Sequence, residues 1–313
     1  MIKILGIVGS TASGKSALAL ELAQRLDGEI ISCDSMQIYR RMDIGTAKPT
    51  AEERATVRHH MIDIADPRET FSCADYVPLA ARAIEDCAAR GKLAIVCGGT
   101  GLYLDALLRK NDFEPQTSDE AVRAELVEWA EHCGAEAVWR ELERIDPESA
   151  AAMHPNNVKR VIRALEIYRV SGVTKTELDR RSREGGMRYD ACVLGLRYAD
   201  RGSLYRRIDF RVDAMLRQGL VEETEALRAE GVFEANRTAA QAIGYKELLP
   251  YCQGEISLSE ASENLKTATR RYAKRQITWF SAKEYVRWLD VTTADEKTFE
   301  EIVNNASEVF KKS

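Results

Sequence analysis

The sequence has 313 residues, enough to bury a full hydrophobic core and to form two domains, or one domain with a large insertion. Hydrophobic residues make up 45% and charged residues 30%, the ordinary balance of a globular protein, and no apolar run approaches the roughly 20 residues needed to span a bilayer. The net charge of −5 is uneven, because residues 151–217 carry 15 Lys and Arg against 8 Asp and Glu, a local charge of +7 that leaves −12 elsewhere. This basic segment is a candidate polyanion-binding surface, but a solvated helical face would have the same composition.

Short β-rich runs alternate with helical patterns in the first third of the sequence, and two more runs follow later. The runs with strand character are residues 2–8, 29–33, 60–64, 93–97, 192–196 and 286–291. Helical spacing of Ala and Leu occupies residues 15–26 and 76–90. Strands separated by helices predict a parallel sheet with helices on both faces. The first run leads directly into a glycine-rich loop and not into a signal-peptide cleavage site, so we interpret it as a strand.

A helical segment interrupts this alternation at residues 112–190. It is rich in Ala, Glu and Arg, and apolar residues recur at helical spacing, as at Val122 and Leu126. We therefore expect an α/β core formed by residues 1–111 and 191–313, with residues 112–190 as a helical insertion domain.

The residues after the first run match the phosphate-loop pattern of Gly, four residues, Gly, Lys, then Ser or Thr. The loop comprises Gly9, Ser10, Thr11, Ala12, Ser13, Gly14, Lys15 and Ser16. Its backbone N–H groups and the start of the following helix would cradle an anion, Lys15 would add a point charge, and the Ser16 hydroxyl would meet a Mg²⁺ bound to phosphate oxygens. The strand–loop–helix context predicts a P-loop NTPase-like core that binds a di- or triphosphate.

The loop alone does not identify the phosphate compound. A kinase or ATPase usually needs an acidic Mg²⁺ ligand at another strand end, yet residues 93–97 lead into GGTG without an Asp. Asp34 and Ser35 follow the second run and should lie at the same carboxyl edge of the sheet as the loop. Asp34 could serve there as a metal ligand, a sugar ligand or a general base, or it could only cap a turn.

Several blocks along the chain resemble those of one family, the bacterial tRNA dimethylallyltransferases, also called isopentenyl-tRNA transferases. Besides the loop GSTASGKS, the similar blocks are DSMQIY (34–39), IGTAKP (44–49), HHMID (59–63), GGTGLYL (98–104), HPNNVKRVIRALE (154–166), QAIGYKE (241–247) and RRYAKRQITWF (270–280). The loop is shared by many enzymes, whereas DSMQIY combined with the two last blocks is far more specific. The sequence departs from the usual family residues at Ser10, Asn157 and Ser281, none of which carries an assigned chemical role.

The resemblance implies that the exocyclic amine of the adenosine just 3′ of the tRNA anticodon attacks dimethylallyl diphosphate and expels diphosphate. It implies that Asp34 is the general base, that Thr100 lies near the reacting adenosine, and that Arg211 joins Lys15 and Mg²⁺ at Ser16 in stabilising the leaving group. Without the resemblance, Arg211 would be interpreted as an exposed helical arginine and Thr100 as a helix N-cap.

The resemblance also implies a set of tRNA contacts around an adenine that is extruded from the anticodon loop. The residues of this set are Asp34, Ser35, Met36, Gln37, Thr100, Arg123, Lys159, Arg160, Val161, Ile162, Arg163, Gln241, Ala242, Ile243, Gly244, Tyr245, Lys246, Lys274, Arg275 and Gln276. Each basic cluster alone would more often be a solvated helix face. Trp279 and Phe280 are expected in the core, and His59 and His60, which have no partner at metal-ligand spacing, are expected to be structural or hydrogen-bonding residues.

Two other functions compete with this interpretation: a P-loop kinase of a nucleotide or small metabolite, and a non-catalytic RNA-binding NTPase. Seven scattered cysteines without a CxxC pair argue against a disulfide framework or a structural zinc site and favour a reducing cytoplasm. We expect a cytoplasmic monomer that does not associate with membranes and that binds the tRNA anticodon stem-loop and dimethylallyl diphosphate.

Overall fold

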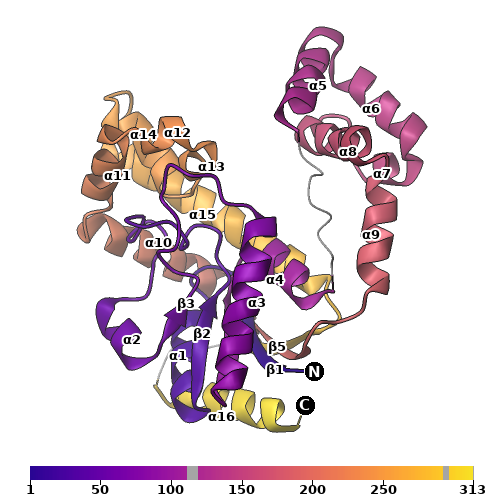
Figure 1. The fold of residues 1–313 in the computed structure, drawn as a ribbon. Coiled ribbons are helices and arrows are strands. Elements are labelled where there is room, and N and C mark those ends of the chain that lie inside the picture. Colours follow the sequence, from indigo (N-terminus) through magenta and orange to yellow (C-terminus); the bar gives the residue numbers. More distant parts are fainter. Residues whose placement is uncertain (111–118, 292–295, 313) are drawn as a thin grey trace. The chain divides into compact units, whose positions relative to one another are not determined.

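The computed structural model describes residues 1–110, 119–291 and 296–312 and divides into two compact units. Unit 1 comprises Met1–Leu108 and Tyr189–Ser313, and unit 2 comprises Arg109–Arg188. Both are drawn in Figure 1. Among the described helices, none combines the length and the apolar character that a bilayer crossing requires.

Unit 1 contains a parallel sheet of six strands in the order β3-β2-β4-β1-β5-β6. Its strands are β1 (Lys3–Gly9), β2 (Gly28–Ser32), β3 (His59–His60), β4 (Leu93–Gly98), β5 (Asp190–Arg197) and β6 (Val286–Asp290). The expected α/β class with a P-loop-type parallel core is therefore confirmed. The expected strand at residues 60–64 is wrong beyond its first residue, because Met61 and Asp63 adopt positive φ angles of 62° and 58° that end the strand.

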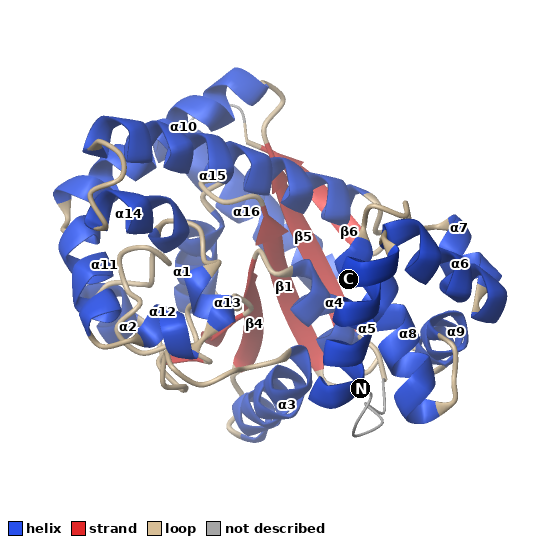
Figure 2. Ribbon diagram, turned by 90° about the horizontal axis from the view of Figure 1, so that it is seen from above, coloured by secondary structure: helices blue, strands red, loops and turns tan. Residues whose placement is uncertain are grey.

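Helices cover both faces of this sheet (Figure 2). The described helices of unit 1 are α1 (Lys15–Arg25), α2 (Ala51–Thr56), α3 (Cys73–Ala89), α4 (Gly101–Leu108), α10 (Arg201–Arg217), α11 (Leu220–Ala229), α12 (Val232–Ala235), α13 (Arg237–Ala240), α14 (Tyr245–Cys252), α15 (Leu258–Ser281) and α16 (Glu296–Lys312). Alternate strand residues such as Leu5 and Ile7 pack with α1 and α16 in one apolar cluster. On α3, which packs on β2 and β4, Tyr76 donates a hydrogen bond of 3.0 Å to the Ser32 carbonyl.

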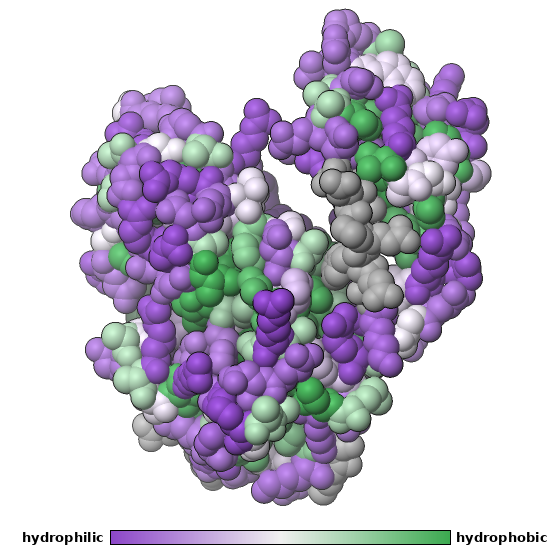
Figure 3. All heavy atoms as spheres, viewed as in Figure 1, coloured by the Kyte–Doolittle hydropathy of each residue, from purple (hydrophilic) through white to green (hydrophobic). Residues whose placement is uncertain are grey.

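A second apolar cluster of unit 1 joins the segment after β2 to the helices that follow β5. Ile38, Tyr39 and Met42 are fully buried against side chains of α10 to α15, such as Tyr245. Figure 3 shows apolar side chains gathered near the middle of unit 1 within a largely hydrophilic outer surface. The segment after β2 is thereby fixed from both sides, which matters for the site below.

Unit 2 is entirely helical in its described part. It contains α5 (Glu120–Cys133), α6 (Ala135–Ile145), α7 (Pro147–Ala151), α8 (Val158–Ser171) and α9 (Lys175–Glu184). The amphipathic faces of α5, α6 and α8 meet in a core of their own around Leu126, Leu142 and Leu165. The unit begins three residues before, and ends two residues before, the segment expected from composition.

Candidate active site

Three neighbouring strand ends form the floor of the site. In the sheet, β2, β4 and β1 lie side by side and parallel, so the segments that follow them emerge at one edge. These segments are the phosphate loop after β1, Asp34 to Gln37 after β2, and Gly99–Thr100 after β4. A cavity of about 320 Å³ lies over this edge, and all of its lining residues belong to unit 1.

The phosphate loop has the backbone shape that an anion cradle needs. Positive φ angles at Ala12 (61°) and Gly14 (92°) turn the chain, and α1 begins immediately afterwards at Lys15. Gly9 cannot carry a side chain, because a Cβ there would lie 2.9 Å from the Leu196 carbonyl oxygen in a backbone with a φ of 151°. The buried Ser13 hydroxyl finds no hydrogen-bond partner among the described residues. The loop therefore offers polar groups that a bound ligand would satisfy.

Two cations, Lys15 and Arg211, line the cavity and form no ion pair with the described residues. Lys15 donates a hydrogen bond of 3.2 Å to the Ser10 carbonyl, and burial lowers its pKa. Burial also lowers the pKa of Arg211, whose charge interacts with Asp34 and with Lys15. Arg211, in α10, lines the cavity, so it is not the exposed helical arginine that its local sequence alone would suggest. Desolvated, unpaired cations are costly, and a bound anion would offset that cost.

The Asp34 carboxylate is oriented by the backbone of the residues that follow it. Its Oδ1 accepts hydrogen bonds from the N–H groups of Met36 (2.9 Å) and Gln37 (3.4 Å), while Oδ2 accepts none from the residues described. Asp34 therefore caps a turn and still keeps one oxygen for chemistry in the cavity that it lines. The Thr100 hydroxyl accepts a hydrogen bond of 3.0 Å from the N–H of Ser35, so it ties the β4 end to the β2 end.

The GGTG turn after β4 is packed closely between the end of β2 and helix α15, and these contacts explain its three glycines. A Cβ at Gly98 would overlap the Cys33 carbonyl, one at Gly99 would overlap the Gln276 amide, and one at Gly101 would overlap the Trp279 ring. Trp279 is 36% exposed, so the expectation that it is a core residue is wrong, whereas Phe280 is 1% exposed as expected.

Two residues that shape this site escaped the sequence analysis, one on the cavity wall and one that binds the backbone of a segment lining the cavity. Tyr272, also on α15, lines the cavity, and burial raises its pKa beside Thr100 and Asp34. Glu223 accepts hydrogen bonds from the consecutive N–H groups of residues 43–45, at 2.8 to 3.1 Å, and one of 2.6 Å from the Tyr245 hydroxyl. Tyr272 could have been noticed because it lies one helical turn before Gln276 within the block RRYAKRQITWF. No local signal marks Glu223.

The residues of unit 1 that are expected to contact tRNA include cavity-lining, exposed and buried side chains. Ser35, Met36 and Gln37 line the cavity, as do Gln241 to Gly244, Arg275 and Gln276. Lys246 and Lys274 are exposed. The Tyr245 side chain is fully buried, and the buried Gln276 side chain uses both ends of its amide within the protein. These two side chains therefore support the site from within and offer no RNA-facing group in this structure.

The basic residues of unit 2 that were expected to contact tRNA divide into two kinds. Arg123 and Arg163 both bind the carboxylate of Glu166, which is fully buried, and so fasten α5 to α8. Lys159 and Arg160 are exposed and make no ion pair with the described residues. Val161 and Ile162, expected among the tRNA contacts, are buried in the unit's core at 0% and 5% exposure. Of the expected tRNA contacts in unit 2, the two cations in the first turn of α8 are therefore the ones that no carboxylate of the described residues already binds.

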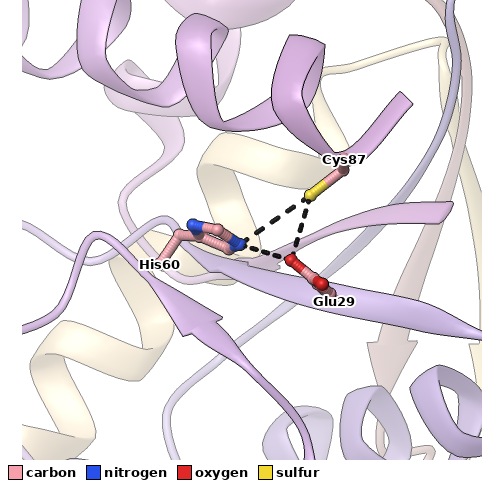
Figure 4. A group of neighbouring side chains, drawn as sticks. All are labelled: Glu29, His60 and Cys87. Carbon is pink, nitrogen blue, oxygen red and sulfur yellow. Dashed lines mark hydrogen bonds and ion pairs between the residues drawn. The ribbon is translucent and has the colours of Figure 1, made fainter. Parts of the chain in front are cut away.

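A buried polar cluster lies away from the cavity on the α3 face of the sheet. His60 Nε2 lies 2.7 Å from Glu29 Oε2, and the Cys87 thiol lies 3.5 Å from the same oxygen (Figure 4). These three ligand atoms are the one group within metal-ligating range among the described residues. Arg90 binds both oxygens of Glu29, and its hydrogen bonds lower the pKa of that carboxyl to about 2. We interpret the cluster as a structural ion pair, consistent with a hydrogen-bonding role for His60.

Comparison with known proteins agrees with this geometry. A family model described as IPP transferase matches residues 37–283. A tRNA dimethylallyltransferase of Caldanaerobacter subterraneus is 46% identical over 98% of this chain and 97% of its own length. The chain belongs to the IPP transferase family.

Solved structures of this family share its fold. A tRNA isopentenylpyrophosphate transferase of Bacillus halodurans is 44% identical, with a TM-score of 0.73 over 100% of this chain and 98% of its own. A eukaryotic dimethylallyltransferase acting on tRNA is 31% identical, with a TM-score of 0.82 over 98% of this chain and 78% of its own.

Proposed function

We propose that this chain transfers a dimethylallyl group from dimethylallyl diphosphate to the exocyclic amine of the adenosine just 3′ of the anticodon in tRNA. One observation carries the proposal: the phosphate loop, two desolvated cations and a carboxylate with an unengaged oxygen line one cavity. The membership of the chain in the IPP transferase family, and the names of its relatives, support this choice of substrates.

The proposed step is a substitution at the allylic carbon. The adenine amine forms a new N–C bond while the C–O bond to diphosphate breaks, and the bonding electrons leave with the diphosphate. Asp34 Oδ2 takes the proton that the amine loses, which matters because the amine lone pair is delocalised into the ring. Lys15, Arg211 and the loop amides stabilise the charge that develops on the leaving oxygen. Thr100, held against Ser35, would help to position the adenosine.

The chain offers few ligands of its own to a Mg²⁺. The Ser16 hydroxyl lies on the cavity wall, and Asp34 lines the same cavity. One protein hydroxyl fits an ion held mainly by the diphosphate oxygens and water, as is usual for Mg²⁺, and this arrangement leaves Asp34 Oδ2 to act as the base. When bound at Ser16, Mg²⁺ would neutralise charge on the departing diphosphate.

The phosphate loop binds the donor in this proposal, so ATP is neither consumed nor required. Apolar side chains such as Val212, Met215 and Leu265 line the cavity beside the cations and suit a five-carbon prenyl group. Nucleotides could still occupy the loop by their phosphates, because a cradle of amides and one Lys recognises phosphate geometry without contacting a base. For the same reason, the loop pattern by itself does not distinguish an ATP site from a diphosphate site.

For the tRNA, we propose that Lys159 and Arg160 meet backbone phosphates while Ser35 to Gln37, Gln241 to Gly244 and Arg275 surround the extruded adenine. We expect the enzyme to act as a monomer in the cytoplasm.

The deciding experiment is incubation of the protein with unmodified tRNA, dimethylallyl diphosphate and Mg²⁺ in nucleotide-free buffer. Mass spectrometry of the digested nucleosides should show one adenosine heavier by one dimethylallyl group. ATP hydrolysis without this product would favour a kinase or an RNA-binding NTPase instead.

A further inference from the structure

Helix α15 presents one face to the strand ends that form the site. Tyr272, Gln276 and Trp279 follow one another at intervals of four and three residues, so their side chains lie in one row along the helix. Gln276 and Trp279 contact Gly99 and Gly101, and Tyr272 lies beside Thr100. The whole row therefore lies against the turn that follows β4.

Gln276 bridges this turn to the phosphate loop. Its Oε1 accepts a hydrogen bond of 2.7 Å from the N–H of Thr11, and its Nε2 donates one of 3.0 Å to the carbonyl of Gly99. The side chain is 5% exposed, so water cannot readily replace either partner. One amide group thus joins the ends of β1 and β4 across the start of the loop.

The Thr11 hydrogen bond bears directly on the shape of the anion cradle. Thr11 precedes Ala12, whose positive φ of 61° begins the turn that aims the later loop amides inward. With its N–H held by Gln276, the peptide group of Thr11 cannot reorient freely. Gly99 must lack a side chain for the amide to fit, so the turn and the glutamine are matched to each other.

We propose that Gln276 is a positioning residue that holds the phosphate loop in its anion-binding form and thereby sets the affinity for the donor diphosphate. This inference rests on the proposed function for the identity of the donor. It differs from the role that family resemblance implies, a direct contact with tRNA. The two roles separate experimentally, because loop positioning affects diphosphate binding in the absence of tRNA.

The test compares Gln276→Met, which keeps the length of the side chain but removes both hydrogen bonds, with Gln218→Met at an exposed glutamine after α10. Inorganic diphosphate with Mg²⁺ is titrated by calorimetry, and tRNA binding is measured separately. Loss of a buried hydrogen bond predicts a roughly five- to hundred-fold weaker diphosphate affinity for Gln276→Met. Affinity for tRNA should stay within about two-fold, and the KM for the donor should rise more than the KM for tRNA.

Hydrogen exchange supplies a direct readout of the loop. Amides of residues 9–16 should exchange faster in Gln276→Met than in the wild type or in Gln218→Met. If Gln276→Met does not fold, Gln276→Asn, which is too short to reach both partners, should show the same changes at smaller size. Weaker tRNA binding with unchanged diphosphate affinity in a folded variant would overturn the proposal in favour of a tRNA contact. Because the diphosphate titration needs no catalysis, it decides the role of Gln276 even if wild-type protein fails to prenylate tRNA.

Discussion

The cavity of unit 1 and the helical surface of unit 2 use the same cationic residue types in opposite ways. In the cavity, Lys15 and Arg211 are desolvated, have lowered pKa values and form no ion pair with the described residues. In unit 2, Arg123 and Arg163 surround the buried Glu166, while Lys159 and Arg160 stand in solvent. The difference separates three kinds of cation: desolvated ones, which we propose bind the charge of the ligand; paired ones, which stabilise the fold; and exposed ones, which we propose attract a polyanion at long range.

This comparison teaches that the burial and the partners of a charged side chain decide its task. A desolvated cation acts strongly on a charge that develops beside it, because little water screens the interaction. An exposed cation contributes mainly through salt-sensitive attraction to phosphates. Substitutions in the two regions should therefore differ in both size and kind.

The largest effect is expected at Asp34, the carboxylate that shares the cavity with the cations. Asp34→Asn keeps an oxygen for the Met36 N–H but cannot take a proton, so the single-turnover rate should fall by about two to four orders of magnitude. Affinity for tRNA should stay within a few fold. Rapid-quench measurements with saturating enzyme would check this, and a near-normal rate would end the assignment of Asp34 as general base.

A smaller but still large effect is expected at Lys15. Lys15→Ala removes a desolvated cation that would bind the leaving group, so kcat/KM for the donor should fall by about 100-fold or more. Lys311→Ala, at an exposed lysine of α16, is the matched control and should leave transfer unchanged.

The same transfer assays in nucleotide-free buffer should proceed normally for the wild type, with added ATP acting at most as a competitor. A strict ATP requirement, or one ADP released for each transfer, would revive the kinase alternative.

The exposed cations of unit 2 should change salt dependence and not chemistry. Replacing Lys159 and Arg160 together by Ala should weaken tRNA binding and reduce the slope of log affinity against log salt by about 0.7 to 0.9 for each phosphate that the variant no longer neutralises. Replacing Arg123 and Arg163 should mainly destabilise unit 2, because the buried Glu166 carboxylate would lose both cationic partners and keep, among the described residues, only the hydrogen bond from the Asp119 N–H. Filter binding over a salt series and thermal unfolding would separate the two outcomes. Equal salt slopes in the wild type and the Lys159/Arg160 variant would show that these residues face solvent only.

The smallest effect on prenyl transfer is expected at Glu29, because its ion pair with Arg90 lies outside the cavity and contributes to stability. Its folded pKa of about 2 lies below the unfolded value near 4.5, so the charged form stabilises the fold above about pH 4.5, and this stabilisation is lost as the pH falls towards 2. Glu29→Gln should lower the free energy of unfolding at pH 7 by about 2 kcal/mol, after allowance for solvent at Arg90. The difference from the wild type should shrink between pH 4.5 and pH 2. Urea unfolding at several pH values would reveal a constant difference if the carboxylate charge were unimportant.

Much of the fold could be predicted because its signals are local. The alternation of β-rich and helical runs located five of the six strands, and the phosphate-loop pattern identified the turn after β1. The strand expected at residues 60–64 failed because two isoleucines in HMIDI favour a strand, whereas the chain turns at Met61 and Asp63 and hydrogen-bonds to the carbonyls of Gln37 and Ile38. Of the site, the carboxyl-edge placement of Asp34 followed from sheet topology alone.

The sequence by itself determined the phosphate loop, the parallel sheet and the family, because each depends on residue types at fixed short spacings. Only the tertiary structure decided which helix faces meet that sheet edge. Arg211 lies desolvated in the cavity, and Gln276 binds the phosphate loop. Glu223, on α11, binds the backbone N–H groups of residues 43–45, which are far from it in the sequence. Helical periodicity states which residues share a face, but the partner of that face is fixed by packing between segments far apart in the chain.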